Sequence, residues 1–548
     1  MKVKSLLLTA LAVALFTGCS EKGDEPDNPD QSMTGKAFLS LSLQSNTGPS
    51  TKADGTIEEK PGDKNESTVT SVQVLLFDNN ERCLGIKTVT GGKIGNSYNS
   101  SSSSTTTAEA SDAIIVPAAT KKVFVVINPY SGGGWNFAEE GVKGRTWSEI
   151  NTAIDATIDN VATAEQFMMV SAGHEKDATN NSFTEKGALT DVSTNIKIPE
   201  DYTEEKINQA KTAAKSSPAV VYVDRLACKV TVSTKADGIT KPEKTSFTFN
   251  GWELSVTNKS VRLYSELKDY SNKTTGAVYR QDNNYLEKEQ PSLENTATLR
   301  AAFNYLENID EASQDMPEVK RNNGTNAYCL ENTMEAKMQK LGFTTKVVVK
   351  AQYTPDGITK DASYFSYGGN FYTLSTLKDA YSSTTSGGLK TDLPKFLYKA
   401  GLMTKTIFEG TDQSAKDGAV SDLVDNSFNA KIGIIGRFCA VRYYHSSVCY
   451  YDVLIRHDKN ITQKMALGRY GVVRNNWYAI SLQSVTGPGT PWIPDPSDPG
   501  PTPTTPDPGP DPDNPTPPDV DDDENDAYLS VKITINPWTY WTQEAELH

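Results

Sequence analysis

Histidine is the side chain most often used for acid–base catalysis or metal binding near neutral pH, and this chain of 548 residues has four. Two of them, His445 and His457, stand close to tyrosines in the sequence. No HExxH, GxSxG, P-loop or CxxC pattern occurs around them or elsewhere. We therefore expect both histidines to be hydrogen-bonded structural residues. The sequence predicts a protein that is not an enzyme and holds no metal or other cofactor.

Acidic residues outnumber basic ones, and the formal net charge is −15 at pH 7. A protein that binds nucleic acid needs basic side chains to neutralise phosphates, so this balance argues against that partner. The densest acidic run, Asp519–Asp526, offers carboxylates for calcium. It lacks the spaced ligands and the turn glycine of an EF-hand loop, so we interpret it as a solvated charged segment.

A cysteine stands at the end of the first apolar run. Lys2 and Lys4 precede eleven residues, Leu6–Phe16, that are apolar except for one threonine. This run is shorter than the ~20 residues needed to span a bilayer and is typical of a signal peptide. The motif LFTGC, which ends at Cys19, resembles the lipobox of bacterial lipoproteins, where the cysteine is lipidated. The sequence thus predicts a signal peptide over residues 1–18 and a flexible tether over residues 19–35 that starts at lipidated Cys19; an ordinary signal peptide is the alternative.

The other five cysteines are scattered and odd in number, so they do not form a disulfide framework. Cys439 and Cys449 flank a predicted hairpin. A disulfide between these two and a pair of buried free thiols are both compatible with the sequence.

Short apolar and alternating runs dominate the chain and predict strands. The predicted strands cover residues 36–45, 68–78, 121–127, 219–234, 245–256, 344–353, 433–444, 448–457, 476–484 and 527–536. Helical spacing is confined to residues 147–170, where isoleucines and a valine recur at intervals of three and four, to residues 204–215 and to a segment near 294–307. We therefore predict a mainly β protein with two β-sandwich domains, over residues 36–217 and 218–486, with short inserted helices.

A proline-rich stretch follows the second predicted domain. Residues 488–518 hold fourteen of the 28 prolines, so this segment cannot form ladder hydrogen bonds or a core. We predict an extended linker over residues 487–526 that reaches up to ~90 Å at about 3.1 Å per residue. Residues 527–548 then form a terminal segment that begins with one more strand.

The two predicted end strands have matching sequences. Residues 37–43 read AFLSLSL and residues 527–533 read AYLSVKI, so aromatic, aliphatic and polar positions coincide. One face of the first strand carries Leu39, Leu41 and Leu43, and the corresponding face of the second carries Leu529, Val531, Ile533 and Ile535. Either both are ordinary half-buried strands, or the second can replace the first in the same groove of another molecule.

Replacement requires that the first strand be cut away. Residues 46–55, NTGPSTKADG, are small, polar and turn-forming, as in loops that proteases nick. The bond between Lys52 and Ala53 is the one basic site in this loop, and a plain surface loop is the alternative.

Several sequence motifs are typical of one protein family. The motifs are GRYGVVRNNWY at 468–478 with ISL at 480–482 and GPG at 487–489, YYDVLIRH at 450–457, VDRLACKV at 223–230, and YLSV at 528–531 leading to PW at 537–538. The chain resembles the major fimbrial subunits of the Bacteroidales short, or minor, fimbria type, which build type V pili. The resemblance implies two transthyretin-like β-sandwich domains and a C-terminal donor strand.

The resemblance also implies a life cycle. Such a precursor is exported as a palmitate-bearing lipoprotein of the outer membrane and loses its first strand to a gingipain-type protease. It then polymerises head to tail with identical subunits, alongside accessory anchor and tip subunits, into a surface fimbria that supports adhesion and virulence. Lys52 stands where the best-known relatives carry arginine, which leaves the protease and the cut bond open. A tip or accessory subunit and a surface glycan-binding lipoprotein are the alternative functions.

Overall fold

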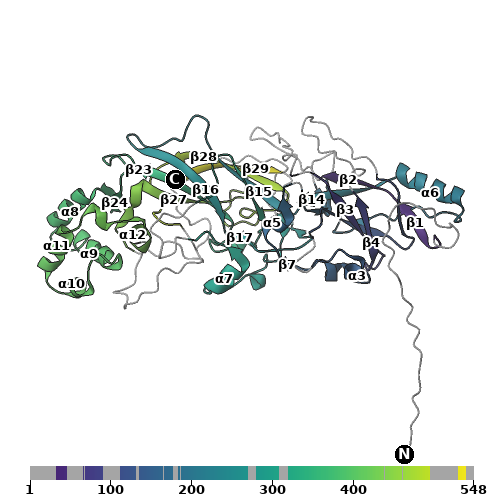
Figure 1. Cartoon of the computed structure of the whole chain (residues 1–548), viewed down its shortest axis with the longest axis horizontal. Coiled ribbons are helices and arrows are strands. Elements are labelled where there is room, and N and C mark those ends of the chain that lie inside the picture. The colour runs from purple at the N-terminus through teal and green to yellow at the C-terminus, as the bar shows by residue number, and fades with distance from the viewer. Residues whose placement is uncertain are drawn as a thin grey trace, which may run out of the picture.

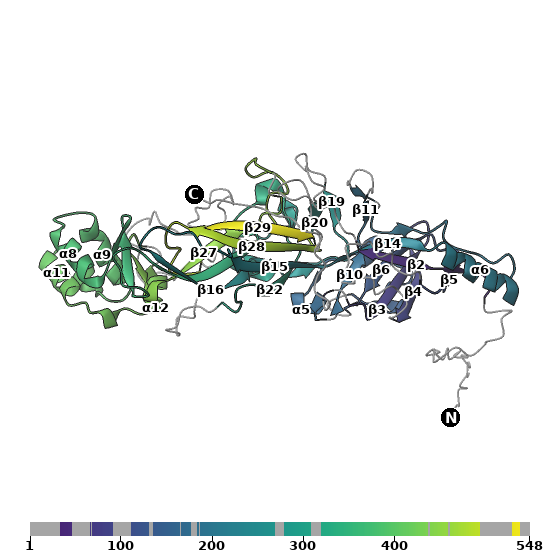
Figure 2. The same cartoon turned by 90° about the horizontal axis from the view of Figure 1, so that it is seen from above.

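The computed structural model describes residues 33–45, 66, 68–90, 111–130, 135–164, 166–176, 183–185, 187–268, 279–307, 319–436, 439–458, 461–493 and 529–537. Cys19, the loop with Lys52 and Ala53, and the linker beyond residue 493 lie outside these ranges. Within them strands predominate, which confirms the predicted mainly β class (Figure 1). The molecule is elongated, with helices at one end and the first strands near the other (Figures 1 and 2).

A seven-stranded sheet, here the first sheet, contains half of the strands described before residue 226. Its order is β2-β14-β10-β6-β3-β4 with β13 beside β6, and all pairs are antiparallel except β14 with β2. The strands are β2 (Leu41–Ser45), β3 (Ser71–Phe77), β4 (Cys83–Thr90), β6 (Lys122–Ile127), β10 (Met169–Ser171), β13 (Thr190–Asp191) and β14 (Ala219–Arg225). Val74 packs into one core with Leu41, whereas Leu75 packs into another with Phe124. Both faces are therefore covered, which explains the continuous apolar runs.

Two further sheets face each other across one large core and form the second unit. The first has the order β22-β15-β28-β29 and the second has the order β16-β23-β27. The strands are β15 (Ala227–Thr234), β16 (Ser246–Ser255), β22 (Asn326–Leu330), β23 (Lys346–Thr354), β27 (Val448–Leu454), β28 (Asn476–Val485) and β29 (Leu529–Pro537). Val230 and Ile480 of one sheet share the core with Val349 and Val453 of the other.

Shorter elements connect these sheets. They are β1 (Lys36–Leu39), β5 (Ile114–Pro117), α3 (Glu139–Val142), β11 (His174–Lys176), β12 (Phe183–Glu185), α6 (Glu204–Ser216), β17 (Thr257–Asn258), β18 (Ser260–Val261), β19 (Glu266–Lys268), β20 (Tyr279–Gln281), η1 (Glu287–Glu289), α7 (Thr296–Ala302), β21 (Phe303–Asn304), η2 (Ala336–Met338), β24 (Tyr364–Tyr367), η3 (Asp425–Ser427) and η5 (His445–Ser447). α6 and α7 correspond to the predicted helices near 204–215 and 294–307.

A helical module, which the sequence analysis missed, is inserted between β25 (Asn370–Tyr372) and β26 (Arg442–Tyr444) at one end of the molecule (Figure 1). Its helices are α8 (Leu374–Ser383), α9 (Leu389–Lys399), α10 (Lys405–Glu409), α11 (Gln413–Ser421) and α12 (Ala430–Ile435). They enclose their own core, which includes Leu377, Phe396 and Tyr443. The predicted strand over residues 433–444 was wrong in its first part, because apolar residues there complete a helix.

The predicted helix over residues 147–170 is also wrong. The structure has two single helical turns, α4 (Trp147–Ile150) and α5 (Ile158–Val161), with one short strand between them and three after them. The strands are β7 (Ile154–Asp155), β8 (Ala162–Thr163), β9 (Gln166–Phe167) and β10. Ile150, Ile154 and Val161 all enter the same core, so their helical spacing reflects shared burial rather than one helix. Tertiary packing overrides the local pattern here.

The predicted strand over residues 219–234 is two strands in different sheets. β14 pairs with β2 and β10 in the first sheet, and β15 pairs with β22 and β28 in the second unit. Leu226 lies between them and is fully buried. The chain therefore passes from the first sheet to the second unit at Leu226, whereas the predicted domain boundary was at residues 217 and 218.

Buried charges hold the two units together at this point. Arg280 of the second unit approaches Asp224 of β14 to 2.6 Å and donates to the carbonyl of Ala172 in the first unit. Asn475 Nδ2 donates to the other oxygen of the same aspartate at 3.0 Å. Each charged side chain of this pair is at most 4% exposed. Removing one partner of a buried pair is strongly destabilising, so this contact restricts the position of one unit on the other.

A neighbouring carboxylate, Asp282, is buried, and its hydrogen-bond partners among the described residues are uncharged. It accepts backbone N–H bonds from Asn284 at 2.9 Å and from Thr333 at 3.0 Å. Burial outweighs these bonds and raises the pKa of Asp282 to about 8.

We expect the free energy of unfolding to depend on the protonation of Asp282. Its folded pKa lies above the unfolded value of 3.8, so its stabilising contribution is complete below that value and is lost as pH rises through about 8. Asp282→Asn should reduce the fall in stability between about pH 5 and about pH 9 by about 1 kcal/mol or more. Urea denaturation at both pH values measures this. Glu287→Gln, a change at an exposed carboxylate, is the control, and an unchanged slope in the Asp282 variant would contradict the assignment.

Candidate strand-exchange site

The predicted displaced strand lies in the interior of the first unit. Leu39 and Leu41 are fully buried and Leu43 is 7% exposed, and all three pack into the core that covers one face of the first sheet. β1 pairs antiparallel with β5, the chain shifts at Ser40, and β2 then pairs parallel with β14. The predicted displaced strand thus pairs with two different strands, β5 and β14.

Backbone hydrogen bonds hold the strand on both sides. On one edge β1 pairs with β5, and on the other Phe38 exchanges two hydrogen bonds of 2.9 Å with the backbone of Lys197. Ser111 donates its backbone N–H to the carbonyl of Leu41 at 2.9 Å and accepts from its N–H through Oγ at 3.0 Å. A strand bonded on both edges leaves two rows of backbone groups unpaired when it departs, and another strand could satisfy both.

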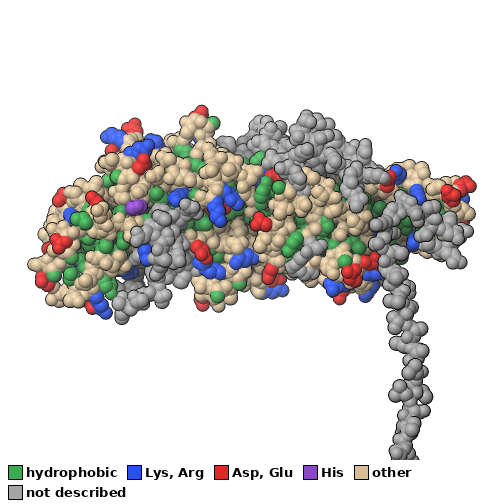
Figure 3. Space-filling view, in the orientation of Figure 1, with side chains coloured by type: hydrophobic (Ala, Val, Ile, Leu, Met, Phe, Trp, Pro, Cys, Tyr) green, Lys and Arg blue, Asp and Glu red, His purple; other side chains and the backbone are tan. Residues whose placement is uncertain are grey.

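Exposed aliphatic side chains surround this strand. Ile115 stands opposite Phe38 and is 36% exposed, Ile198 follows Lys197 and is 55% exposed, and Val220 stands opposite Ser42 and is 41% exposed. Among the described residues, Val424 is the remaining exposed large hydrophobic, so three of these four side chains adjoin the first strands. Elsewhere on the face in Figure 3, hydrophobic side chains and charges of both signs are interspersed along the molecule.

The predicted donor segment lies at a different sheet edge. β29 pairs antiparallel with β28 and ends the order of its sheet, so in the described structure it has a strand neighbour on one side. Leu529, Val531, Ile533 and Ile535 stand opposite Val485, Leu482, Ile480 and Tyr478 of β28. These four residues of β28 are buried. The predicted donor positions therefore pair in register with a buried row of β28.

The first strands and the last strand lie apart in one molecule. β1 lies beside α6 at the end away from the helical module, and β29 runs along the middle beside β28 (Figures 1 and 2). The two segments with matching sequences therefore lie at separate sites of the structure.

The far side of the predicted cut loop is anchored at Glu66. Its carboxylate pairs with Lys229 Nζ at 2.6 Å and accepts a hydrogen bond from the Tyr328 hydroxyl, and both charged side chains are at most 2% exposed. Arg225 Nε donates to its carbonyl at 2.9 Å. Lys52 and Ala53 lie outside the described residues, between β2 and this anchor. A cut between them would separate the first strands from a segment held by the second unit.

The histidines and cysteines of the sequence analysis have structural partners. His457 Nδ1 lies 2.8 Å from the Tyr478 hydroxyl and His445 Nδ1 lies 3.2 Å from that of Tyr443, as expected of hydrogen-bonded residues. Within the described ranges no group of three potential metal ligands gathers. Cys439 and Cys449 are not joined by a disulfide, and they are buried in different cores. β26 pairs with β24 and β27 with β23, so the predicted hairpin between these cysteines is wrong.

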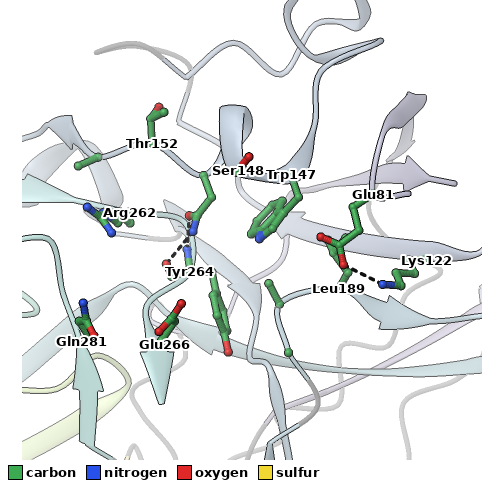
Figure 4. Close-up of a pocket in the computed structure, with 14 residues that line it drawn as sticks. Glu81, Lys122, Trp147, Ser148, Thr152, Leu189, Arg262, Tyr264, Glu266 and Gln281 are labelled. Carbon is green, nitrogen blue, oxygen red and sulfur yellow. Dashed lines mark hydrogen bonds and ion pairs between the residues drawn. The ribbon is translucent and has the colours of Figure 1, made fainter. Parts of the chain in front are cut away.

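A cleft of about 690 Å³ lies between the two units (Figure 4). Lys122 and Glu81 form an ion pair of 2.8 Å at one side, and Asn151 exchanges hydrogen bonds with the backbone of Tyr264 at the other. The Trp147 ring packs against that of Phe124, with centroids 4.5 Å apart. These polar and aromatic groups already have partners within the chain, and the cleft forms a polar seam between the units.

The C-terminal part of the chain matches a known protein family. Residues 442–544 match the family model described as major fimbrial subunit protein type IV, fimbrillin, C-terminal. This region is similar to the fimbrillin C-terminal region. The matched region runs from β26 through β28 to β29 and contains the motif at 468–478, so the resemblance to fimbrillins is confirmed here. No curated protein sequence matches the chain. In the described residues, no helix has the length and apolar character to cross a membrane.

Several solved structures of Bacteroidales proteins align with most of this chain. A proposed cell adhesion protein from Parabacteroides distasonis is 12% identical with a TM-score of 0.38, over 93% of this chain and 99% of that one. A second, from Bacteroides eggerthii, is 10% identical with a TM-score of 0.35, over 95% and 99%. The tip fimbrial protein Mfa3 from Porphyromonas gingivalis is 10% identical with a TM-score of 0.29, over 82% and 95%.

Leu41→Ala should lower the free energy of unfolding of the uncut chain by about 2–5 kcal/mol, because it removes a fully buried side chain from the core of the first unit. Val220→Ala, on the adjoining strand but 41% exposed, is the matched control and should change it by about 0.5 kcal/mol or less. Urea denaturation followed by tryptophan fluorescence measures both. Equal effects of the two substitutions would contradict the burial of the first strand.

Proposed function

We propose that this chain is the structural stalk subunit of a surface fimbria that supports cell adhesion. It is exported as an outer-membrane lipoprotein through Cys19, cut in the loop at residues 46–55, and polymerised by exchange of the first strand for the C-terminal segment of another copy. The match of residues 442–544 to the fimbrillin C-terminal model supports the fimbrial role. The observation that carries the exchange is the position of residues 36–45 as a buried strand with partners on both edges.

Energetics favour replacement of this strand once it has been removed. Burial of its three leucines contributes roughly 5–10 kcal/mol. Its backbone hydrogen bonds add about 0.5–1.5 kcal/mol each. The total is comparable with the stability of a whole domain, about 5–15 kcal/mol. A subunit without its first strand would therefore remain unstable until another strand entered the groove.

The present position of the donor segment also favours exchange. β29 has a strand partner on one side, β28, whereas a strand in the place of β1 gains partners on both sides. Release from β28 breaks one row of hydrogen bonds, and entry into the vacated groove forms two rows over part of its length. The predicted start of the linker at residue 487 is wrong, because Thr490 exchanges backbone hydrogen bonds with Tyr450 and Ile493 is buried in the second unit. The remaining part of the predicted linker, residues 494–526, provides the reach for this transfer between molecules.

Head-to-tail contacts of this kind do not close on themselves and produce filaments. The partners are identical subunits, accessory anchor and tip subunits, and a processing protease of gingipain type that accepts Lys52. A surface glycan-binding lipoprotein is the rival function, but that class relies on exposed aromatic platforms. The exposed large hydrophobics among the described residues are all aliphatic, which disfavours it.

Cutting of the purified, lipid-free chain with a lysine-specific protease should produce ladders that resist SDS without heating, because each strand fills the groove of another subunit. Mass spectrometry identifies the cut bond and gel electrophoresis follows the ladders. A chain that ends at Asp526 lacks the donor strand and should be cut but remain monomeric. Persistent monomer after confirmed cleavage at Lys52 would refute the proposal, as would normal ladders from the shortened chain.

Cys19→Ala should abolish incorporation of labelled palmitate into the precursor, because Cys19 is the cysteine that follows the predicted signal peptide. Cys83→Ala is a control because Cys83 is buried in the first unit. Palmitate labelling in cells measures both, and continued labelling of the Cys19 variant would contradict the lipid anchor.

A further inference from the structure

Phe38 differs from the other apolar residues of the first strands. Ala37, Leu39 and Leu41 pack into the core against the first sheet, whereas Phe38 belongs to a separate cluster with α6. Its ring is fully buried. The strand therefore fills two sites at once, an aliphatic groove on one side and an aromatic socket on the other.

The socket is formed by the apolar stripe of α6. Ile207, Ala210 and Ala214 recur at helical spacing and are the buried residues of this helix. The two alanines are small and leave room for a ring. Lys211 Nζ lies 5.6 Å from the centre of the Phe38 ring, at the distance of a cation–π contact. We name the site formed by these residues of α6 the Phe38 socket.

α6 depends on the ring that it covers. Among the described residues, Phe38 is the fully buried partner of its apolar stripe, and Met33, Ala113 and Tyr202 pack around it partly buried. The helix lies at the end of the molecule beside β1 (Figures 1 and 2). A helix of 13 residues is only marginally stable by itself in water. When the first strand leaves, the stripe is exposed to water until another ring enters.

Aliphatic alternation alone does not define how a donor strand is placed. Leu529, Val531, Ile533 and Ile535 offer four aliphatic positions for the three sites of Leu39, Leu41 and Leu43. A shift of two residues keeps aliphatic side chains on the inner face, because side chains alternate with a period of two. A further feature must select one register.

We propose that the Phe38 socket binds the aromatic side chain of the entering strand from a second copy of this chain, and that the residue is Tyr528. This inference rests on the proposed strand exchange and adds the site that sets its register. In the match of residues 37–43 with 527–533, Tyr528 takes the place of Phe38. A shift of two residues would place Asp526 or Ser530 in the socket, and a polar or charged group is unfavourable there.

Substitutions of Tyr528 test the socket through the rate of ladder formation after cleavage. Tyr528→Phe should form ladders at the wild-type rate, because the ring is kept. Tyr528→Ala should form them at least about tenfold more slowly, in line with the loss of a buried aromatic side chain. Tyr540→Ala, which removes an aromatic residue of the same tail outside the matched segment, is the control and should be neutral. Circular dichroism of each uncut variant verifies that it is folded.

Cross-linking tests the register directly. Val220→Cys, a change at an exposed position opposite Ser42, is combined in one chain with Lys532→Cys, which takes the place of Ser42 in the matched register, or with Ser530→Cys or Thr534→Cys, and treated with a short thiol cross-linker after assembly. Tyr528 is kept in every one of these variants. Intersubunit products should form with position 532 and be at least about tenfold weaker with position 530 or 534. Wild-type ladders together with a rapid Tyr528→Ala variant, or with preferred cross-linking at position 530 or 534, would overturn the socket alone. Absence of ladders from the wild-type chain would refute strand exchange itself.

Discussion

The first unit depends on a strand from the very start of the described chain. Residues 36–45 pair with β5 and then with β14, and their leucines fill the core on one face of the first sheet. Because the backbone groups of β5, β14 and Lys197 turn toward this strand, its loss would expose polar and apolar surface together. The integrity of the unit is therefore tied to a segment that one cut can separate from the rest.

Two buried ion pairs at the junction of the two units hold the remaining structure together. Glu66 pairs with Lys229 in the buried junction, and Asp224 pairs there with Arg280. All four residues lie C-terminal to the predicted cut loop. Buried pairs are expensive to break one partner at a time, so the junction resists separation even when the neighbouring groove is vacant.

The helical module and the first unit show where local patterns mislead. Ile150 and Ile154 have helical spacing but enter one core from separate turns and strands. The apolar run near residue 433 forms the end of α12 around a helical core, although it is compatible with a strand. In both places the choice is made by contacts with residues distant in the sequence, which periodicity alone does not contain.

By itself, the sequence determined the mainly β class, most long strands, α6, and the alternation of Leu39, Leu41 and Leu43, because side-chain period and apolar content are local properties. It also contained the fimbrillin-like motif at residues 468–478. Only the tertiary structure decided that the chain changes sheet at Leu226 and that Phe38 faces α6 while its neighbours face the first sheet. Strand partners and the two sides of a buried strand depend on long-range packing, and no short segment encodes them alone.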